Sequence, residues 1–493
     1  MALPPAPADA PPVSGRPDLP PVPLDPEAVG HDRAGQIETR GIDVVPEAER
    51  HGSARELFVV WAASNINYLY LVLGGTLVLL GLTAWQAMLV VVAGNLFWAL
   101  IGFLSVSGAR SGTPSSVVTR AMFGVRGNRV NVAVVGWLIC IAYEAINLSI
   151  GALAGFALVE QLGLPAGTVM KLAIVAATAV VTLAISVYGH ATIVRASGWF
   201  TSVLLLCMVV LAVCVVRHAD LSFVPPGAPH GAGVLAAAFT GLTIIASGPL
   251  SWGTSADYAR YLPSTTSARA VTGWTALGGF LPSVLLGGVG VLAATSVDMT
   301  DPQTSLGQLL PRWFYPIFLL VIVLGSITNN VLTAYSSGLQ LQAVGIRASR
   351  ARTVLLDGVV GVALAGYALF VSNFIDTLSG VLELSVVLLA PSIAIYATDA
   401  ALRGNRYDGP ELHDETPGSR FWYRRGVNPA GACAQVLGSA AAVLCVHSTA
   451  FTGPVASALG GTDLSTVVGP LVAALVYATL MTSRVNRSPE VTP

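Results

Sequence analysis

Long apolar stretches alternate with short polar connections from about residue 58 almost to the end of the chain. A helix needs about 20 predominantly apolar residues to cross roughly 30 Å of hydrocarbon. The composition agrees with such spans, because 54% of the residues are hydrophobic and only 10% are charged. The pattern predicts an all-α polytopic membrane protein with twelve transmembrane helices, at about 58–80, 86–108, 132–158, 169–188, 196–216, 234–256, 274–297, 313–341, 354–374, 380–400, 431–449 and 465–483.

The basic residues provide an independent test of this count, because the cytoplasmic connections of membrane proteins are enriched in Lys and Arg. If the N-terminus lies inside, all of the 25 basic residues except Lys171, Arg217 and Arg312 fall on the cytoplasmic side. We therefore expect a protein of the cell membrane with both termini in the cytoplasm.

Two of the predicted spans are interrupted. The sixth contains Gly248, Pro249 and Gly253, which disfavour a continuous helix, and the first contains Asn65 and Asn67. Paired broken helices five spans apart are typical of transporters built from an inverted repeat. The predicted organisation is a disordered cytoplasmic arm at 1–55, two five-helix repeats at 56–216 and 217–400, a cytoplasmic loop with two additional helices at 401–485, and a cytoplasmic tail at 486–493.

The third span carries candidate site residues at membrane depth. Tyr143 and Asn147 are four residues apart and share one helix face. Glu144 is costly at this depth, so it either packs against a neighbouring helix or couples a proton. Trp252, beside the break of the sixth span, offers a stacking face for a flat heterocycle. Near it, Asp257 is expected to make a local contact with Arg260.

The eighth span is dense in amides and hydroxyls. Asn329 and Asn330 are adjacent in mid-span, where amide groups need partners, so they are expected to face the protein interior. Thr328 and Asn329 form a candidate sodium site together with freed carbonyl groups of the first span, because oxygen atoms suit a small hard cation. Polar packing between helices is the alternative.

Several segments together resemble the nucleobase:cation symporters, and within them the purine-cytosine permease branch. These segments are 37–46, 61–65, 119–128, 143–147, 252–261 and 329–336. The resemblance implies a LeuT-like five-plus-five inverted repeat with two additional C-terminal helices, alternating access, and nucleobase uptake driven by a proton or a sodium ion.

The resemblance also implies roles for individual residues. Trp252 would supply one stacking ring, Asn147 an amide, and Tyr143 would replace the Trp that is usual in the third span. Fungal relatives read Asn-Asn-Ile-Pro-Asn in the eighth span, whereas this chain has Thr333 in place of the last amide. The identity of the base therefore stays open.

The function expected from the sequence is secondary active import of cytosine, a purine or a related heterocycle by cation symport. The proton, with Glu144 as its carrier, is preferred to sodium. We expect Tyr143, Asn147, Trp252, Asn330 and Thr333 to bind substrate, and Glu144, Asn65, Asn67, Thr328 and Asn329 to couple the cation.

Other functions remain as alternatives. An amino-acid or amine symporter would use the same scaffold, as would a carrier of a specialised heterocyclic metabolite. An enzyme is disfavoured, because the sequence gives no sign of clustered His or Cys or of paired carboxylates at one depth. No cofactor and no nucleic-acid partner is expected besides the co-transported ion, the substrate and the lipid bilayer, and the sequence leaves the oligomeric state open.

Overall fold

The computed structural model describes residues 32–371, 374–448 and 451–485, without the side chains of 372–384 and 483–485. The first 31 residues of the predicted arm and the predicted tail at 486–493 lie outside this part of the chain. Throughout the described ranges the regular structure is helical, and no strand forms. This confirms the all-α membrane fold.

Ten helical segments are long and apolar enough to cross a membrane, and the bent pair α1 and α2 would make an eleventh, counted over the described residues. A shorter apolar helix, α19, adds to these. The count of twelve spans and the inverted repeat stay predictions. The main helices are α1 (Ala54–Asn65), α2 (Tyr68–Leu79), α3 (Ala84–Asn95), α4 (Phe97–Ser111), α8 (Leu138–Gln161), α9 (Thr168–Tyr188), α10 (His190–Val216), α11 (Ala232–Leu250), α13 (Ala268–Ala294), α15 (Tyr315–Val344), α16 (Arg350–Phe370), α17 (Phe374–Leu402), α19 (Pro429–Cys445) and α21 (Ser465–Val485).

Short helical pieces lie between these spans. They are η1 (Glu47–Glu49), α5 (Ser115–Val118), α6 (Arg120–Phe123), α7 (Val125–Asn131), the π-helical turn η2 (Val132–Trp137), α12 (Ala256–Ala259), α14 (Pro302–Leu309), α18 (Gly409–His413) and α20 (Pro454–Ala458).

Both predicted breaks are present. α1 and α2 meet at an angle of 60°, and the Oδ1 atom of Asn67 accepts a hydrogen bond from the backbone of Leu69 at 3.0 Å, which caps α2. In the sixth span, α11 continues through Pro249 to Leu250, and the chain then turns over 251–255 before α12. The second break therefore lies a few residues beyond Gly248 and Pro249.

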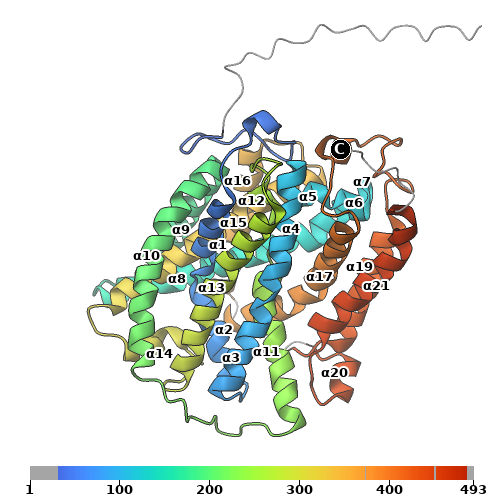
Figure 1. Ribbon diagram of the computed structural model, residues 1–493. Helices are drawn as coiled ribbons and strands as arrows, with labels where there is room; N and C mark the ends of the chain where they lie inside the picture. The colour runs from blue at the N-terminus through green and yellow to red at the C-terminus, as the bar shows by residue number, and fades with distance from the viewer. Residues whose placement is uncertain (1–31, 372–373, 449–450, 486–493) are drawn as a thin grey trace, which may run out of the picture. The chain divides into compact units, whose positions relative to one another are not determined.

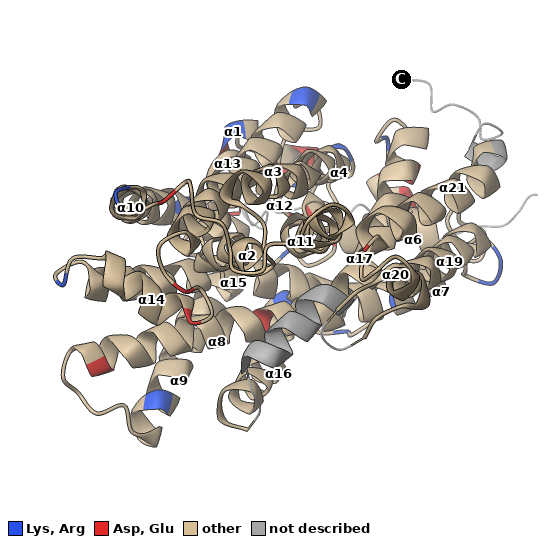
Figure 2. Cartoon of the chain, turned by 90° about the horizontal axis from the view of Figure 1, so that it is seen from below, with Lys and Arg blue, Asp and Glu red and all other residues tan. Residues whose placement is uncertain are grey.

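The helix packing places both breaks around a common centre. α8, α15 and α16 pack against one another, α13 packs against α1, α2 and α4, and α11 packs against α2 and α17. α19 and α21 pack together against α17, at the side of the bundle away from α9 and α10 (Figure 1). Seen from below, the helices carry few charged side chains along their length (Figure 2).

Residues 32–53 differ from the disordered arm expected from the sequence. Their backbone pairs with distant segments: Glu38 N with Tyr188 O at 3.0 Å, and Val45 N with Gly112 O at 2.9 Å. Val45 is fully buried. The end of the bundle that carries these residues is termed the arm face, and α21 also ends there (Figure 1).

Glu38 is the centre of the contacts at the arm face. Its Oε1 atom accepts hydrogen bonds from Arg260 Nη2 at 2.7 Å, from Tyr261 OH at 2.6 Å and from Tyr335 OH at 3.1 Å. Its Oε2 atom accepts one from His190 N at 2.9 Å. Glu38 and Arg260 are almost completely buried, at 1% and 0% side-chain exposure. This network ties residues 32–53 to the inner part of the sixth span, to α10 and to α15.

The contact expected between Asp257 and Arg260 is therefore replaced. Arg260 pairs with Glu38, whereas the Oδ1 atom of Asp257 accepts a hydrogen bond from Ser115 N at 2.7 Å. Asp32 lies at the edge of the same region, 2.9 Å from His190 Nδ1. Burial acts to raise the pKa of Asp32, but its hydrogen bond and charge interaction with His190 outweigh this effect, so the net pKa is lowered.

Candidate functional site

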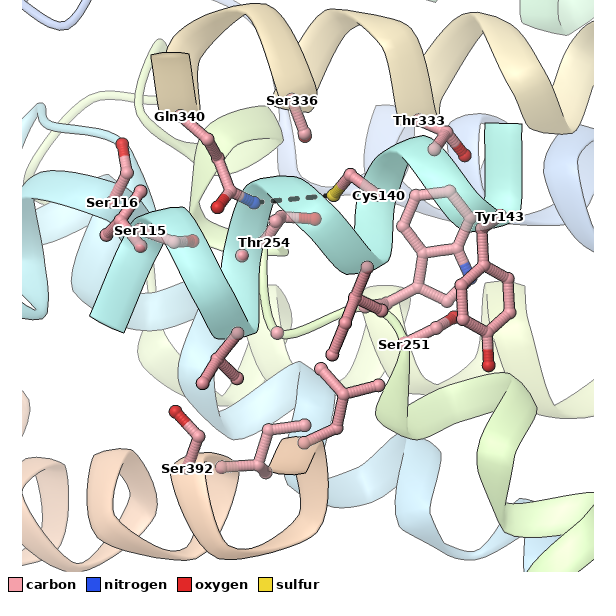
Figure 3. Close-up of a pocket in the computed structure, with 18 of the residues that line it drawn as sticks. Ser115, Ser116, Cys140, Tyr143, Ser251, Thr254, Thr333, Ser336, Gln340 and Ser392 are labelled. Carbon is pink, nitrogen blue, oxygen red and sulfur yellow. Dashed lines mark hydrogen bonds between the residues drawn. The ribbon is translucent and has the colours of Figure 1, made fainter. Parts of the chain in front are cut away.

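A cavity of about 90 Å³ lies between the two helix breaks, α8, α15 and α17. Its lining continues to α5, where Ser115 and Ser116 contribute (Figure 3). Asn131, at the end of α7, also belongs to the lining. On the same measure, one water molecule needs about 10–15 Å³, so the cavity accommodates more than a single water.

The structure brings six of the ten predicted site residues together on this cavity and leaves four away from its lining. The lining residues are Asn67, Tyr143, Asn147, Trp252, Asn329 and Thr333. The residues away from it are Asn65, Glu144, Thr328 and Asn330.

Two helix faces supply a large part of the polar lining, and the sequence analysis identified only parts of them. Residues spaced by four, three and four positions lie on one helix face. Each face has this spacing: Gly136 at the end of η2 with Cys140, Tyr143 and Asn147 on α8, and Asn329, Thr333, Ser336 and Gln340 on α15. The Nε2 atom of Gln340 donates to Cys140 Sγ at 3.4 Å (Figure 3). Extending the two stripes by one or two turns in the sequence would have found Cys140, Ser336 and Gln340.

Tyr143 and Trp252 are two of the four aromatic residues in the described lining, which also includes Tyr70 and Tyr396. Tyr143 is buried, and its hydroxyl lies 3.4 Å from Ser247 O and 3.3 Å from Ser385 Oγ. Trp252 follows the end of α11 and packs edge-on against Trp61, with ring centroids 5.1 Å apart at an angle of 78°. This ring contact helps to hold the side chain of Trp252 at the cavity wall.

A chain of amides connects three elements beside these rings. The Nδ2 atom of Asn147 donates to Asn329 Oδ1 at 2.8 Å, and the Nδ2 atom of Asn329 donates to Ser64 O at 2.9 Å. The chain therefore links α8 through α15 to the end of α1. Asn147 Oδ1 is buried and has no partner in the described part of the chain. This oxygen is available to a hydrogen-bond donor on a ligand.

The freed carbonyl groups of the first span are satisfied by α15. Thr328 Oγ1 lies 3.0 Å from Ala63 O and 2.8 Å from Gly325 O. These oxygens suit a sodium ion, but Asn329 presents an N–H group to Ser64 O. Asn65 turns instead to its own helix, where it donates to Trp61 O at 2.7 Å.

Glu144 and Asn330 lie apart from the cavity lining. Glu144 is buried, on the side of α8 that faces α16, where the backbone of Gly361 approaches its carboxyl group. Asn330 is also buried, and its Oδ1 atom finds no hydrogen-bond partner among the described residues. Adjacent polar residues on a helix point about 100° apart, so Tyr143 and Glu144, like Asn329 and Asn330, serve different environments.

Comparisons with known proteins agree with this architecture. Residues 44–469 match the family model described as permease for cytosine/purines, uracil, thiamine, allantoin. YxlA of Bacillus subtilis, named as a purine-cytosine permease, is 25% identical over 468 residues, covering 92% of this chain and 97% of its own. The purine-cytosine permease fcyB of Emericella nidulans is 24% identical over 474 residues, covering 90% and 88%.

Solved structures share the fold. Mhp1, a nucleobase-cation-symport-1 family transporter in a closed conformation with bromovinylhydantoin bound, superposes with a TM-score of 0.75 at 18% identity and covers 92% of this chain and 97% of its own. The inward-facing conformation of Mhp1 gives 0.67 at the same identity, covering 92% and 96%. A Na+-coupled sialic acid symporter gives 0.56 at 9% identity, covering 92% and 93%.

Proposed function

Because this chain belongs to the family of permeases for cytosine/purines, uracil, thiamine and allantoin, we propose that it imports a nucleobase by symport with a proton. The substrate is cytosine, a purine or a closely related heterocycle. The observation that carries this proposal is the chemistry of the cavity, whose described lining combines aromatic rings, amides and hydroxyls with no charged side chain. Such a lining suits a neutral planar ring with polar edges. It offers no counter-charge to an amine or an amino acid.

In this proposal the base stacks between Trp252 and Tyr143. Stacking on aromatic side chains tolerates any base, because every base has a π-face. The polar edge of the base forms hydrogen bonds with Asn147 Oδ1, which lacks a partner among the described residues, and with Thr333 on α15. Gln340 extends this polar edge toward the arm face. Asn330, which is not in the lining, drops out of the binding set.

The two broken spans serve as hinges for alternating access. Both breaks contribute to the cavity, through Asn67 and Trp252, so a change in either bend changes access to the base. With the arm face in the cytoplasm, as the distribution of Arg and Lys favours, both termini lie inside and the cavity extends toward the cytoplasm. The membrane is then the cell membrane.

The coupling ion is assigned as a proton on the basis of the first break. There the Asn329 amide donates to Ser64 O, so a neutral side chain satisfies this carbonyl group without an ion. The oxygens around Thr328 are the only feature of the described site that favours sodium as the alternative.

The ion assignment predicts the behaviour of Thr328→Ala. In proteoliposomes, wild type and Thr328→Ala are both expected to accumulate labelled base under a proton gradient in sodium-free buffer, with Thr328→Ser as the control that keeps the hydroxyl. Accumulation that needs a sodium gradient, and that is lost in Thr328→Ala but kept in Thr328→Ser, would replace the proton by sodium.

The stacking role predicts a loss of base affinity in Trp252→Ala. Base–aromatic stacking contributes about 1–3 kcal/mol, so the apparent Kd for the preferred base should rise by about 5- to 150-fold. Binding of labelled cytosine and hypoxanthine to the purified protein measures this change. Trp252→Phe should recover much of the affinity, and Trp199→Ala, at a 59% exposed position on α10, should bind as wild type does. Equal affinities for Trp252→Ala and wild type would remove the stacking assignment.

A further inference from the structure

A pair of buried carboxyl groups lies between α8 and α16, outside the cavity lining. Glu144 is 3% exposed and Asp357 is completely buried. Trp137 and Glu144, seven positions apart, share a helix face that points toward α16, where Trp137 Nε1 donates to Asp357 and Glu144 approaches Gly361. Gly361, one turn after Asp357, leaves room for this contact, since a Cβ atom there would stand 3.0 Å from Glu144 Cδ. The sequence analysis saw no paired carboxylates, because the two residues belong to different predicted repeats.

The partners of the pair are neutral. Asp357 Oδ1 accepts hydrogen bonds from Trp137 Nε1 at 2.8 Å and from Ser337 Oγ at 2.6 Å. Asp357 Oδ2 and Glu144 Oε2 are buried and have no hydrogen-bond partner within the described chain.

No described cation compensates the pair. Arg350, two turns before Asp357 on α16, is engaged by Glu38 and by Ser186 O. On α9, the Lys171 ammonium lies over the ring of Phe156. The remaining titratable groups nearby, a thiol and a carboxyl group, carry no positive charge.

Those remaining groups are Cys140, one turn before Glu144, and Asp257, which accepts from Ser115 N. Two unpaired carboxylates in such apolar surroundings cannot both stay ionised. The pair must therefore hold at least one proton as a unit.

Residues that neighbour the pair in the sequence also line the proposed base site. Cys140 and its partner Gln340 both line the cavity. The residue before Ser337, Ser336, also lines it and lies 2.9 Å from Tyr258 OH at the inner part of the sixth span. Cys140 lies one helical turn from Glu144, and Ser336 is adjacent to Ser337, so the cavity lining and the pair lie on neighbouring faces of the same two helices.

The hydrogen bonds of the pair also reach the helices that hold the base. Trp137 ends the π-helical turn η2, whose Gly136 lines the cavity, and Ser337 lies on α15. Hydrogen bonds to a charged carboxylate are stronger than those to a neutral carboxyl group. A change in the protonation of the pair therefore changes how tightly α16 holds η2 and α15.

We propose that Glu144 and Asp357 together form the binding site of the co-transported proton. The proposal rests on the proposed proton symport and adds the second carboxyl group, Asp357, with Trp137 and Ser337 as the groups that transmit its protonation state. Proton and base then raise each other's affinity, as linkage requires.

The transport test uses Glu144→Gln and Asp357→Asn in proteoliposomes. Each amide keeps the shape of the carboxyl group, so the helix contact is retained. With the membrane potential clamped at zero, a one-unit proton gradient can drive at most about tenfold accumulation for one proton per base. Wild type should approach this limit. Both variants should exchange labelled base for unlabelled base yet accumulate it only to about onefold.

A matched control is Asp463→Asn. Asp463 is buried too, but its Oδ1 atom accepts from Ser465 N at 2.8 Å at the start of α21, away from α8 and α16. This variant should accumulate base as wild type does. Proton-driven accumulation that persists in either Glu144→Gln or Asp357→Asn would overturn the proposed site, even though base symport itself would stand.

An infrared measurement tests the site without any base. The C=O stretch of a protonated carboxyl group in the purified protein should titrate with pH in wild type and Asp463→Asn. It should lose intensity in Glu144→Gln and in Asp357→Asn. An unchanged band in both variants would overturn the pair as a proton site. If wild type transports no base while this band behaves as expected, the proposed function fails and the proton site remains.

Discussion

Glu38→Ala is expected to destabilise the protein by about 3–5 kcal/mol. The substitution removes the carboxylate that pairs with Arg260, whose guanidinium group is completely buried and has no other ion-pair partner among the described residues. It also removes the carboxylate near Arg350, at 3.5 Å. The loss should appear as a much lower unfolding temperature of the detergent-purified protein, and as reduced yield of folded protein.

Two control variants test the reason for this loss of stability. Glu38→Gln keeps an acceptor for Tyr261 and Tyr335 but loses the charge, so its loss of stability should be smaller. Glu411→Ala removes a carboxylate that pairs with Arg420 at the surface, where both side chains are more than a third exposed. Its effect should stay within about 1 kcal/mol. If Glu38→Ala is as stable as Glu411→Ala, residues 32–53 do not hold the arm face together.

The sequence predicted the breaks because local chemistry produces them. Asn67 caps the second half of the first span with its own side chain. Gly248 and Pro249 weaken the end of α11 through backbone freedom and a missing N–H group. The position of the second break, beyond Leu250, depended on packing around Trp252 and could not be read from residue types.

The packed stretch at 32–53 escaped prediction for a different reason. Its composition is polar, and its contacts join residues far apart in the chain: Glu38 and Arg260 are 222 positions apart. A polar segment becomes ordered when distant partners bury and satisfy its groups, and no local pattern records such partners.

The same difference between local chemistry and long-range contacts applies to the predicted site residues. Tyr143, Asn147 and Trp252 were predicted to face the interior, because aromatic and amide groups at membrane depth require an inward-facing environment, and all three line the cavity. Their hydrogen-bond partners could not be predicted from the sequence. Asn147 and Asn329 are 182 positions apart, and the sequence placed one with the substrate and the other with the cation. In the structure one hydrogen bond joins them, so base binding and the first-span break share one amide chain.

Gly290→Ala is expected to disrupt the packing of α13 against α2 and to abolish uptake. A Cβ atom at Gly290 would lie 1.9 Å from Leu71 O, which is backbone and has no rotamer to give way. A Cβ atom at Gly74 on α2 would likewise lie 2.0 Å from Gly287 O on α13, so the two helices are in close backbone contact at both glycines. Small residues permit such close approach of membrane helices.

The displacement would reach the cavity, because α2 begins at the first break and carries Tyr70 in the lining. Overpacking of this kind costs about 1–3 kcal/mol, and a backbone clash should reach the upper end. Gly273→Ala, on the same helix, is the matched control: nothing lies within 4 Å of its Cβ position, so helix propensity should stabilise it by up to about 1 kcal/mol. Thermal stability and base uptake of both variants give the comparison. Equal stability for the two alanine variants would show that α2 and α13 do not cross this closely.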